Sequence, residues 1–391
     1  MTVSHWRRSP NPARLDTEVL IIGAGIAGLS AALHLARRGV PNIVLERRTV
    51  GSGASTRNAG FLMRGAADHY ADAHRLYGPE LARTVWRWTE ENLDGLRAEG
   101  IESIASYRRV PSALLALDQP QHDALAESAD LLRRDGFRVG WATSGSDSLW
   151  AAGTPRAALI NPDDASINSW DLIRALAARL PAPILENQEV HALAADADSV
   201  LALAPTLAVR ARRVLVCTNA YAELLLPAMS GLVTPRRGQM LALRVPPPPA
   251  FRLDASYYAN HGSEYFRQTA DGALVVGGCR TYFADREIGF EDRTTSYVQE
   301  ALEAFARRTL GLATLDITAR WSGTMGFSPD GLPLIGPAPL PFGSTGPASD
   351  SRVWFLGGFT GHGMSMAYRC ARAAVDALLD GIPTPFPLDR V

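Results

Sequence analysis

Lysine is absent from this sequence, and all 39 basic residues are arginine. The absence excludes mechanisms that need a lysine Schiff base or a P-loop lysine. Neither sign of charge is in excess, because 40 acidic residues leave a formal net charge of -1. A nearly neutral chain gives no indication of a nucleic-acid or membrane-surface partner. We therefore expect a small-molecule ligand.

Cysteine is scarce as well. Only Cys217, Cys279 and Cys370 are present, they lie far apart, and no C-x-x-C pair occurs. This spacing argues against a zinc site or a disulfide framework, and it favours buried thiols in a reducing compartment.

Long apolar runs are missing too. No apolar segment follows the arginines of the opening MTVSHWRRSP, and the most apolar window, residues 19–36, is interrupted by glycine and polar positions. The sequence predicts neither a signal peptide nor a membrane span, and hence a cytoplasmic protein. With 391 residues, of which 47% are hydrophobic, the chain can form one large or two ordinary globular domains.

A strand, a glycine turn, an amphipathic helix and a second strand are predicted by residues 18–46, EVLIIGAGIAGLSAALHLARRGVPNIVLE. Gly23, Gly25 and Gly28 form a G-x-G-x-x-G motif. The first glycine permits the turn, the second lets a pyrophosphate approach, and the third lets the helix pack on the strand. Glu46 lies close to the interval of about 20 residues at which an acid binds the ribose. The unit predicts a dinucleotide site at the N-terminus of the helix.

A second loop rich in glycine and hydroxyl groups, GSGASTRNAG at 51–60, follows directly. A simple NAD site has no obvious use for it. Its backbone N–H groups and the hydroxyls of Ser52, Ser55 and Thr56 would hold more of a long dinucleotide, including the part nearer the reactive ring. On the residues of this loop alone, a flexible surface loop is an equally good interpretation.

The middle of the chain predicts mostly helix and then a sheet. Short alternating runs, broken by four prolines and by Asp271-Gly272, are typical of antiparallel strands. His69 and His74, five residues apart on a predicted helix, do not share a face, so they are not predicted to bind a metal together. We expect a helical pattern over 70–135, a helix over 169–180, a strand, turn and helix over 212–225, the antiparallel sheet over 233–283, and a helix over 294–310.

The C-terminal segment returns to a strand, a glycine-rich turn and a helix, with GGFTGHGMSMAYRCARAA at 357–374. A helix that begins near Met364 would direct its positive end at a ligand above residues 361–363. A flavin that accepts hydride becomes an anion and needs such donors. Gly361 and Gly363 would allow the close approach. Thr360 and His362 either add hydrogen bonds to the ligand or serve the backbone of their own loop.

The motifs IIGAGIAGLSAA, GSGASTRNAG, WSGTMGFSPDGLPLIG and GGFTGHGM, in this order, resemble the FAD-dependent D-amino-acid oxidase superfamily, which includes glycine, sarcosine and γ-glutamylputrescine oxidases. The opening SHW is similar to the polyamine-related branch. The resemblance is specific over residues 19–62 and 321–379. It implies an α/β protein, α+β overall, with a Rossmann-like FAD domain of the glutathione-reductase type that is discontinuous in sequence and holds an inserted antiparallel-sheet substrate domain. The expected boundaries are 15–85, 150–230 and 320–391 for the FAD domain, and 86–149 and 231–319 for the substrate domain.

The resemblance also implies which residues surround FAD. Val190 would lie near the adenine through its backbone, and Thr218 near the pyrophosphate. The full expected set is Gly23, Gly25, Ile26, Ala27, Gly28, Glu46, Arg47, Ser52, Gly53, Ala54, Ser55, Val190, Thr218, Gly358, Thr360, Gly361, His362, Gly363 and Met364.

Two departures from the family pattern bear on the chemistry. Sarcosine-oxidase-like members attach flavin covalently through a cysteine, and its place is taken here by Gly323, so noncovalent FAD is expected. The lysine with which those members activate oxygen has no counterpart in this chain, so the expected electron acceptor is either oxygen or another carrier.

Substrate recognition departs from the family as well. Amino-acid oxidases hold the substrate carboxylate with arginine, and Met325 occupies the place of one such arginine. Arg267 resembles a carboxylate arginine of the glycine-oxidase type and shares a strand face with Tyr265, although an arginine on the solvent face of a sheet explains the position equally well. Weaker pocket candidates are Arg57, Tyr257, Tyr258 and His261.

The implied function is FAD-dependent oxidation of an amine or amino acid. Hydride would pass from the α-carbon of a neutral amine to flavin N5, and water would hydrolyse the resulting imine. Met325 favours a secondary or N-alkyl amine, or an amine derivative, over a simple α-amino acid. The alternatives are an NAD-linked dehydrogenase, a flavin monooxygenase that uses NAD(P)H, and a non-catalytic FAD-binding protein.

Overall fold

The computed structural model describes residues 12–66, 69–196, 198–338 and 351–391. The SHW tripeptide that contributes to the family resemblance lies outside these ranges. The helices are α1 (Ile26–Arg37), α2 (Tyr70–Tyr77), α3 (Pro79–Ala98), α4 (Gln119–Arg134), α5 (Ser148–Ala151), α6 (Ser169–Ala178), α7 (Ala222–Leu225), α8 (Ser296–Thr309) and α9 (Gly363–Asp380). The strands are β1 (Ala13–Ile22), β2 (Asn42–Leu45), β3 (Phe61–Leu62), β4 (Arg108–Arg109), β5 (Ser112–Ala116), β6 (Gly140–Ala142), β7 (Ala157–Asn161), β8 (Ala165–Ser166), β9 (Ile184–Leu185), β10 (Ala192–Ala195), β11 (Val200–Leu203), β12 (Leu207–Val216), β13 (Thr234–Arg244), β14 (Ser256–Ala259), β15 (Glu264–Gln268), β16 (Leu274–Gly278), β17 (Asp316–Phe327), β18 (Leu334–Pro337) and β19 (Val353–Gly357).

The first sheet is built on parallel strands. Its order is β10-β11-β12-β1-β2-β9, and β19 extends it from β12 to β18. Strands β2 and β12 flank β1 in parallel, while β19 runs parallel to β12. Alternate residues of β1 and β2 belong to two different apolar clusters, one on each face of the sheet. Strands that are buried on both faces read as continuous apolar runs, which explains the sequence pattern at residues 19–22 and 42–45.

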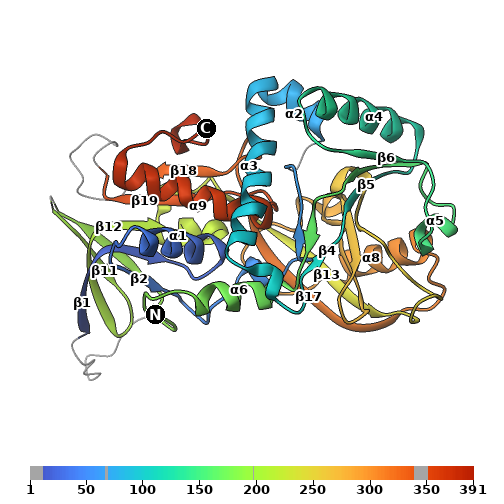
Figure 1. Ribbon diagram of the computed structural model, residues 1–391. Coiled ribbons are helices and arrows are strands. Elements are labelled where there is room, and N and C mark those ends of the chain that lie inside the picture. Colours follow the sequence, from blue (N-terminus) through green and yellow to red (C-terminus); the bar gives the residue numbers. More distant parts are fainter. Residues whose placement is uncertain (1–11, 67–68, 197, 339–350) are drawn as a thin grey trace.

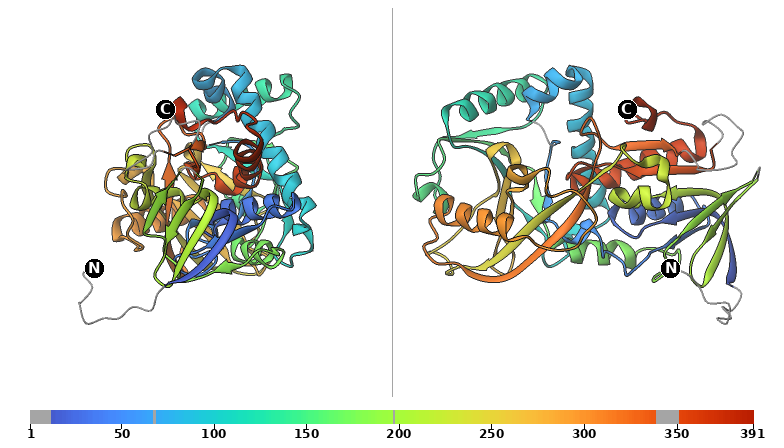
Figure 2. Two further views of the ribbon diagram at one scale, coloured as in Figure 1. Left: turned by 90° about the vertical axis from the view of Figure 1, so that its left-hand side faces the viewer. Right: turned by 180° about the vertical axis from the view of Figure 1, so that it is seen from behind.

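The second sheet has the order β17-β13-β16-β15-β14-β5-β7-β6 and is mostly antiparallel. The predicted sheet over 233–283 and the predicted helix over 294–310 are both confirmed, the latter as α8. Helix α3 runs between the two sheets in Figure 1 and in the rear view of Figure 2. The molecule is therefore a mixed α/β protein with two sheet-centred halves.

The helical pattern expected over 70–135 is wrong in its middle. Helices α2, α3 and α4 occupy most of the range, but β4 and β5 lie between α3 and α4. Four of the five residues of β5 are buried. A short, fully buried apolar run cannot be told from a buried helical segment by its periodicity, and this is why the pattern was misleading.

The strand pairing also moves the expected domain boundaries. Strand β7, expected in the FAD domain, pairs with β5 and β6 of the second sheet. Strand β17, which begins just before the expected boundary at 320, pairs with β13 along almost its whole length. Conversely, α3 packs on α9 beside the first sheet although residues 86–98 were assigned to the substrate domain. Long strand pairs keep a segment in one sheet across an expected boundary.

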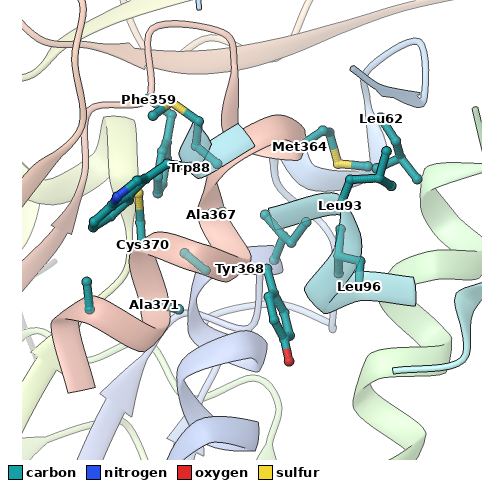
Figure 3. Close-up of a cluster of buried hydrophobic side chains, with 14 of the residues drawn as sticks. Leu62, Trp88, Leu93, Leu96, Phe359, Met364, Ala367, Tyr368, Cys370 and Ala371 are labelled. Carbon is teal, nitrogen blue, oxygen red and sulfur yellow. The ribbon is translucent and has the colours of Figure 1, made fainter. Parts of the chain in front are cut away.

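Helices α1, α3 and α9 share one apolar core. In Figure 3, Met364 at the start of α9 lies beside Leu62 and Leu93, and Tyr368 lies one turn further along α9 near Leu96. Cys217, Cys279 and Cys370 are all buried free thiols, as expected. No helix in the described ranges is long and apolar enough to cross a membrane.

A buried polar network ties the same three helices together. The His34 ring packs against Tyr368 at 4.6 Å between centroids, and His34 Nε2 lies 3.2 Å from the Tyr368 carbonyl oxygen. The Tyr368 hydroxyl donates to Glu99, which also pairs with Arg37. Burial lowers the pKa of His34 to about 4. His34 therefore stays neutral in the folded protein.

Replacing His34 with Gln tests this network. A free histidine has a pKa of about 6.5, so between that value and about 4 only the unfolded chain binds the proton, and stability falls as pH falls. Between neutral pH and pH 5, protonation of His34 in the unfolded chain should lower the free energy of unfolding of the wild type by about 2 kcal/mol. His34→Gln has no group that titrates at this position and should not show this loss. Urea midpoints at pH 7.5 and pH 5 measure it: the gap between the two proteins should narrow at pH 5. An unchanged gap would show that His34 is not buried in the neutral form.

Candidate functional site

The carboxyl ends of the parallel strands converge on one edge of the first sheet. Strand β1 ends at Ile22 before the glycine turn, β2 at Leu45 before Glu46, β12 at Val216 before Cys217, and β19 at Gly357 before the C-terminal glycine loop. In open α/β sheets this edge is where ligands bind. Two cavities of about 230 and 300 Å³ lie here. They are contiguous, because they share the wall residues Gly25, Ala54, Ser55, Cys217 and Asn219.

The smaller cavity contains the residues expected around the ribose and the adenine. Glu46 and Val190 both lie on its wall. The carboxylate of Glu46 accepts hydrogen bonds from the backbone N–H groups of Ala24 and Arg48, each at 2.9 Å. These bonds fix the carboxylate at the mouth of the glycine turn. Arg47 packs over the Tyr221 ring at 4.1 Å on the same wall.

The glycine turn leaves no room for side chains. A Cβ on Gly28 would lie 1.9 Å from the carbonyl oxygen of Gly23, so this glycine is required for packing rather than for contact with a ligand, and it lies outside both cavities. A Cβ on Gly25 would lie 2.9 Å from Ser55 Oγ. Gly25 precedes α1 without a side-chain cap, and Ser55 Oγ accepts from the backbone N–H of Ile26. The first turn of α1 lies on the wall of the larger cavity, where Gly25, Ile26 and Ala27 line it.

The second glycine loop is part of the cavity wall and not a detached surface loop. Ser52, Gly53, Ala54 and Ser55 all line the smaller cavity. The Ser52 hydroxyl is engaged with Thr49 at 2.7 Å. Ser55 and the following backbone therefore form the part of the loop that faces the glycine turn.

Thr218, expected near the pyrophosphate, lies on the wall of the smaller cavity. Its hydroxyl is buried and has no hydrogen-bond partner among the described residues. A buried hydroxyl without a partner is unfavourable unless a ligand satisfies it. This orphaned group fits a bound polar ligand at the junction of the two cavities.

The C-terminal loop closes the larger cavity. Thr360, Gly361, His362, Gly363 and Met364 lie on its wall, and α9 begins there without a side-chain cap. Both residues whose role was open face the cavity and also make bonds within the protein. Thr360 Oγ1 contacts the Gly358 carbonyl and the Ser328 N–H, and His362 Nδ1 lies 3.1 Å from the Thr360 carbonyl. Gly358 is not on the wall; its N–H donates to Asn219 Oδ1 and so holds the loop in place.

Aromatic rings form another side of the larger cavity. Phe61 packs edge-on against Tyr258 and Tyr265, with centroids at 5.2 and 6.2 Å. All three rings line the cavity. The two tyrosine hydroxyls form no hydrogen bond with any described residue. Burial raises the pKa of Tyr265 to about 12 and that of Tyr258 further, so both remain neutral donors.

Arg267 is an expected substrate residue that the structure places outside both cavities. Its guanidinium donates to the backbone carbonyls of Ala59, Ile167 and Gln268, and the side chain does not line either cavity. Burial lowers its pKa to about 10. The expectation that Arg267 holds a carboxylate is corrected: its donors are already used to hold the backbone behind the aromatic wall. It is not a solvent-facing arginine either, because it is only 5% exposed.

The candidates on the wall of the larger cavity are Arg57, Tyr258, His261, Tyr265 and Met325, and Arg57 is already paired. Arg57 bonds Asp292 at 2.6 Å and the Ser322 carbonyl. Met325 and Gly323 alternate along β17 and both face the cavity. Tyr257, a weaker candidate, is instead a core residue whose hydroxyl donates to Asp147.

Two histidines of the cavity stack on each other. His69 stacks on His261 at 4.8 Å between centroids, and both line the larger cavity, whereas His74 lies against Asp135. Within the described ranges no cluster of three metal-ligating side chains occurs. The separation of His69 from His74 agrees with the sequence expectation.

Some wall residues were missed by the sequence reasoning. Asn219, in the turn after β12, lines both cavities and bonds Gly358. Arg280 and Phe61 line the larger cavity. The sequence offered a signal for Asn219, because it follows a buried parallel strand and such positions lie at the ligand-binding edge of the sheet. Arg280 follows the end of an antiparallel strand, where no motif marks it.

Left-handed backbone conformations gather at the walls of both cavities. The six non-glycine residues with positive φ in the described ranges all lie on the walls or next to wall residues: Asn187, Asn219, Asn260, His261, Cys279 and Thr360. Such conformations persist only where the surrounding structure over-determines them, and they concentrate at functional sites. The strain independently marks this edge of the molecule as the site.

Comparison with known proteins agrees with this geometry. Residues 18–377 match the family model described as FAD dependent oxidoreductase. Gamma-glutamylputrescine oxidoreductase of Escherichia coli K12 is 25% identical, with 96% of this chain and 89% of the relative covered. Glycine oxidase of Geobacillus kaustophilus is 26% identical, with 82% and 84% covered.

Two solved structures have a similar fold. L-proline dehydrogenase from P. horikoshii has a TM-score of 0.75 at 19% identity, with 96% of both chains covered. The glycine oxidase from Geobacillus kaustophilus has a TM-score of 0.74 at 22% identity, with 95% of this chain and 96% of that one covered. The expectation of an FAD-dependent oxidoreductase with relatives that act on amines and amino acids is therefore confirmed. The chain belongs to the family of FAD-dependent oxidoreductases, and its cofactor is FAD.

Proposed function

We propose that this chain oxidises an amine in the larger cavity, with a secondary or N-alkyl amine or an amine derivative favoured over a simple α-amino acid. The observation that carries the proposal is the continuity of the two cavities. A long dinucleotide in the smaller one would extend past the shared residues Gly25 and Ser55, and its reactive ring would then lie beside the aromatic wall.

The residues present fit FAD along this whole path. Glu46 would hold the ribose, and Val190 would lie at the adenine. The N-terminus of α1 and the unpartnered Thr218 hydroxyl would hold the pyrophosphate. The N-terminus of α9 would stabilise negative charge on the ring. Binding is noncovalent in this proposal, because Gly323 supplies no thiol.

The same fit assigns a role to each of the two sheet-centred halves. The first sheet with α1 and α9 would form an FAD domain of the glutathione-reductase type. The second sheet would form a substrate domain inserted into it, from which β14, β15 and β17 contribute wall residues.

When bound, FAD supplies a two-electron acceptor for hydride leaving the carbon next to the nitrogen. The protein's part is to position a neutral amine and to exclude water. Phe61, Tyr258 and Tyr265 form an apolar side with two neutral hydroxyl donors. The substrate is left as an imine. Water then adds to the imine carbon, which becomes a carbonyl group, and the nitrogen leaves as an amine or as ammonia.

Met325 favours amines without a carboxylate at its own position, because a thioether cannot pair with an anion. Relatives that act on amines support this reading. They include the gamma-glutamylputrescine oxidoreductase and a 4-methylaminobutanoate oxidase of Paenarthrobacter nicotinovorans, which is 28% identical over 69% of this chain and 32% of its own length.

An anaerobic absorbance spectrum tests the proposed function. Purified protein should be yellow and should bleach when one class from a panel of N-methyl amino acids, D-amino acids and polyamine derivatives is added. The rate at which the colour returns in air then separates oxygen from another electron acceptor. Bleaching by NADPH alone would favour a monooxygenase, and flavin that no amine bleaches would contradict amine oxidation.

Gly25→Ala tests the path of the cofactor. The new Cβ would lie 2.9 Å from Ser55 Oγ and would also stand where the pyrophosphate approaches the backbone. The flavin-to-protein ratio after purification should fall at least about tenfold. Ser55→Ala alone is the control, and combining it with Gly25→Ala relieves the internal clash. If the double variant recovers full flavin content, only the clash mattered and the proposed path is wrong.

A further inference from the structure

Arg280 is a cavity-lining arginine without a counter-ion. It begins η6 (Arg280–Phe283), directly after β16, and lines the larger cavity. Among the described residues no carboxylate lies within 4 Å of its guanidinium, and no protein atom accepts a hydrogen bond from it. Arg57, the other arginine on this wall, is paired with Asp292. Of the two arginines that line the larger cavity, Arg280 is therefore the one whose N–H groups remain available to a ligand.

The backbone around Arg280 is held in a strained form. Cys279 has φ of +56°, a left-handed conformation that residues with a side chain rarely adopt. Gly278 precedes it with φ of +120°, and a Cβ there would lie 2.0 Å from the Ser263 carbonyl oxygen. The Cys279 N–H donates to that same oxygen. This turn fixes where the Arg280 side chain leaves the backbone.

The surroundings of Arg280 are positive and partly apolar. Its guanidinium lies over the Phe327 ring at 4.7 Å, and Arg236 lies over the same ring at 5.6 Å. Burial, and after it the charge of Arg236, lowers the pKa of Arg280. A guanidinium remains charged at neutral pH even so. Glu287 offsets this repulsion only in part, because its carboxylate is paired with Arg237, and an anionic ligand in contact with Arg280 would relieve the repulsion further.

We propose that an acidic group of the substrate, a carboxylate, pairs with Arg280, which makes Arg280 a specificity-determining residue. The inference rests on the proposed function and narrows it to amines that also carry an acidic group. A guanidinium binds a carboxylate with two parallel hydrogen bonds. The Thr281 and Ser263 hydroxyls, 2.9 Å apart on the same wall, offer further contacts. The acid is thus recognised from η6, not from the β17 position that Met325 occupies.

The test measures ligand binding to the FAD-containing protein and needs no turnover. Butanoate and succinate are titrated while the flavin absorbance is followed, and butanamide serves as the neutral match. The wild type should bind at least one carboxylate more tightly than the amide. Arg280→Met should weaken that carboxylate at least about tenfold, leave the amide unchanged and retain full flavin content.

Two further variants keep the result interpretable. Arg280→Lys should recover only a small part of the affinity, because it lacks the planar fork and because burial beside Arg236 favours its neutral form. Arg236→Met, on the same ring but outside the cavity wall, is the matched control and should weaken binding less than about threefold. Equal carboxylate affinities in wild type and Arg280→Met would overturn the proposal, as would carboxylates that bind no better than the amide.

The two proposals fail separately. If an amine that carries an acidic group bleaches the flavin as fast in Arg280→Met as in the wild type, amine oxidation stands and the role of Arg280 falls. If carboxylates bind through Arg280 but no amine bleaches the flavin, the role of Arg280 stands and amine oxidation falls.

Discussion

The pairing of β12 with two different strands along one edge is the constraint on which the site depends. β11 takes residues 208–211 of that edge, and β19 takes residues 214–216. The second pairing brings the C-terminal glycine loop to the edge of the sheet where the N-terminal glycine turn already lies. Helices α1 and α9, which begin more than 300 positions apart in sequence, therefore both start at this edge, and neither N-cap residue supplies a side-chain cap. Two positive helix ends then face one continuous cavity, which suits a ligand with a pyrophosphate at one end and an anionic ring at the other.

The site also requires rigid walls, because the proposed reaction depends on holding the substrate in position. The left-handed residues on the walls hold their conformations through bonds made away from the cavity. Asn219 accepts from the Gly358 N–H, and Asn260 donates to the buried carboxylate of Glu264 at 2.6 Å. Arg267 acts in the same way, since its guanidinium holds the backbone behind the aromatic wall. Side chains that were candidates for ligand contact thus support the wall, and a preformed wall reduces the entropy lost when a substrate is positioned.

The sequence predicts those parts of the site that consist of a single continuous segment. The strand, turn and helix at 18–46, and the C-terminal turn before α9, are confirmed because glycine spacing and apolar runs determine them within a few residues. The fate of Arg267 could not be read in this way. Strand alternation gives the face on which Arg267 lies, but the carbonyl that accepts its hydrogen bond belongs to Ala59, 208 positions earlier in the chain. Arg280 was missed for a similar reason, because a left-handed Cys279 redirects the chain and no periodicity encodes that turn.

The absence of lysine shapes the chemistry of this surface beyond the exclusion of Schiff bases. Guanidinium groups are weakly hydrated and pack on aromatic rings, as Arg47 does on Tyr221 and Arg280 on Phe327. An ammonium group at position 280 would be strongly hydrated, and burial beside Arg236 would press it toward its neutral form. A guanidinium in the same place stays charged while its planar edge remains free for a carboxylate. The positive charge in this half-buried corner can therefore persist because an arginine carries it.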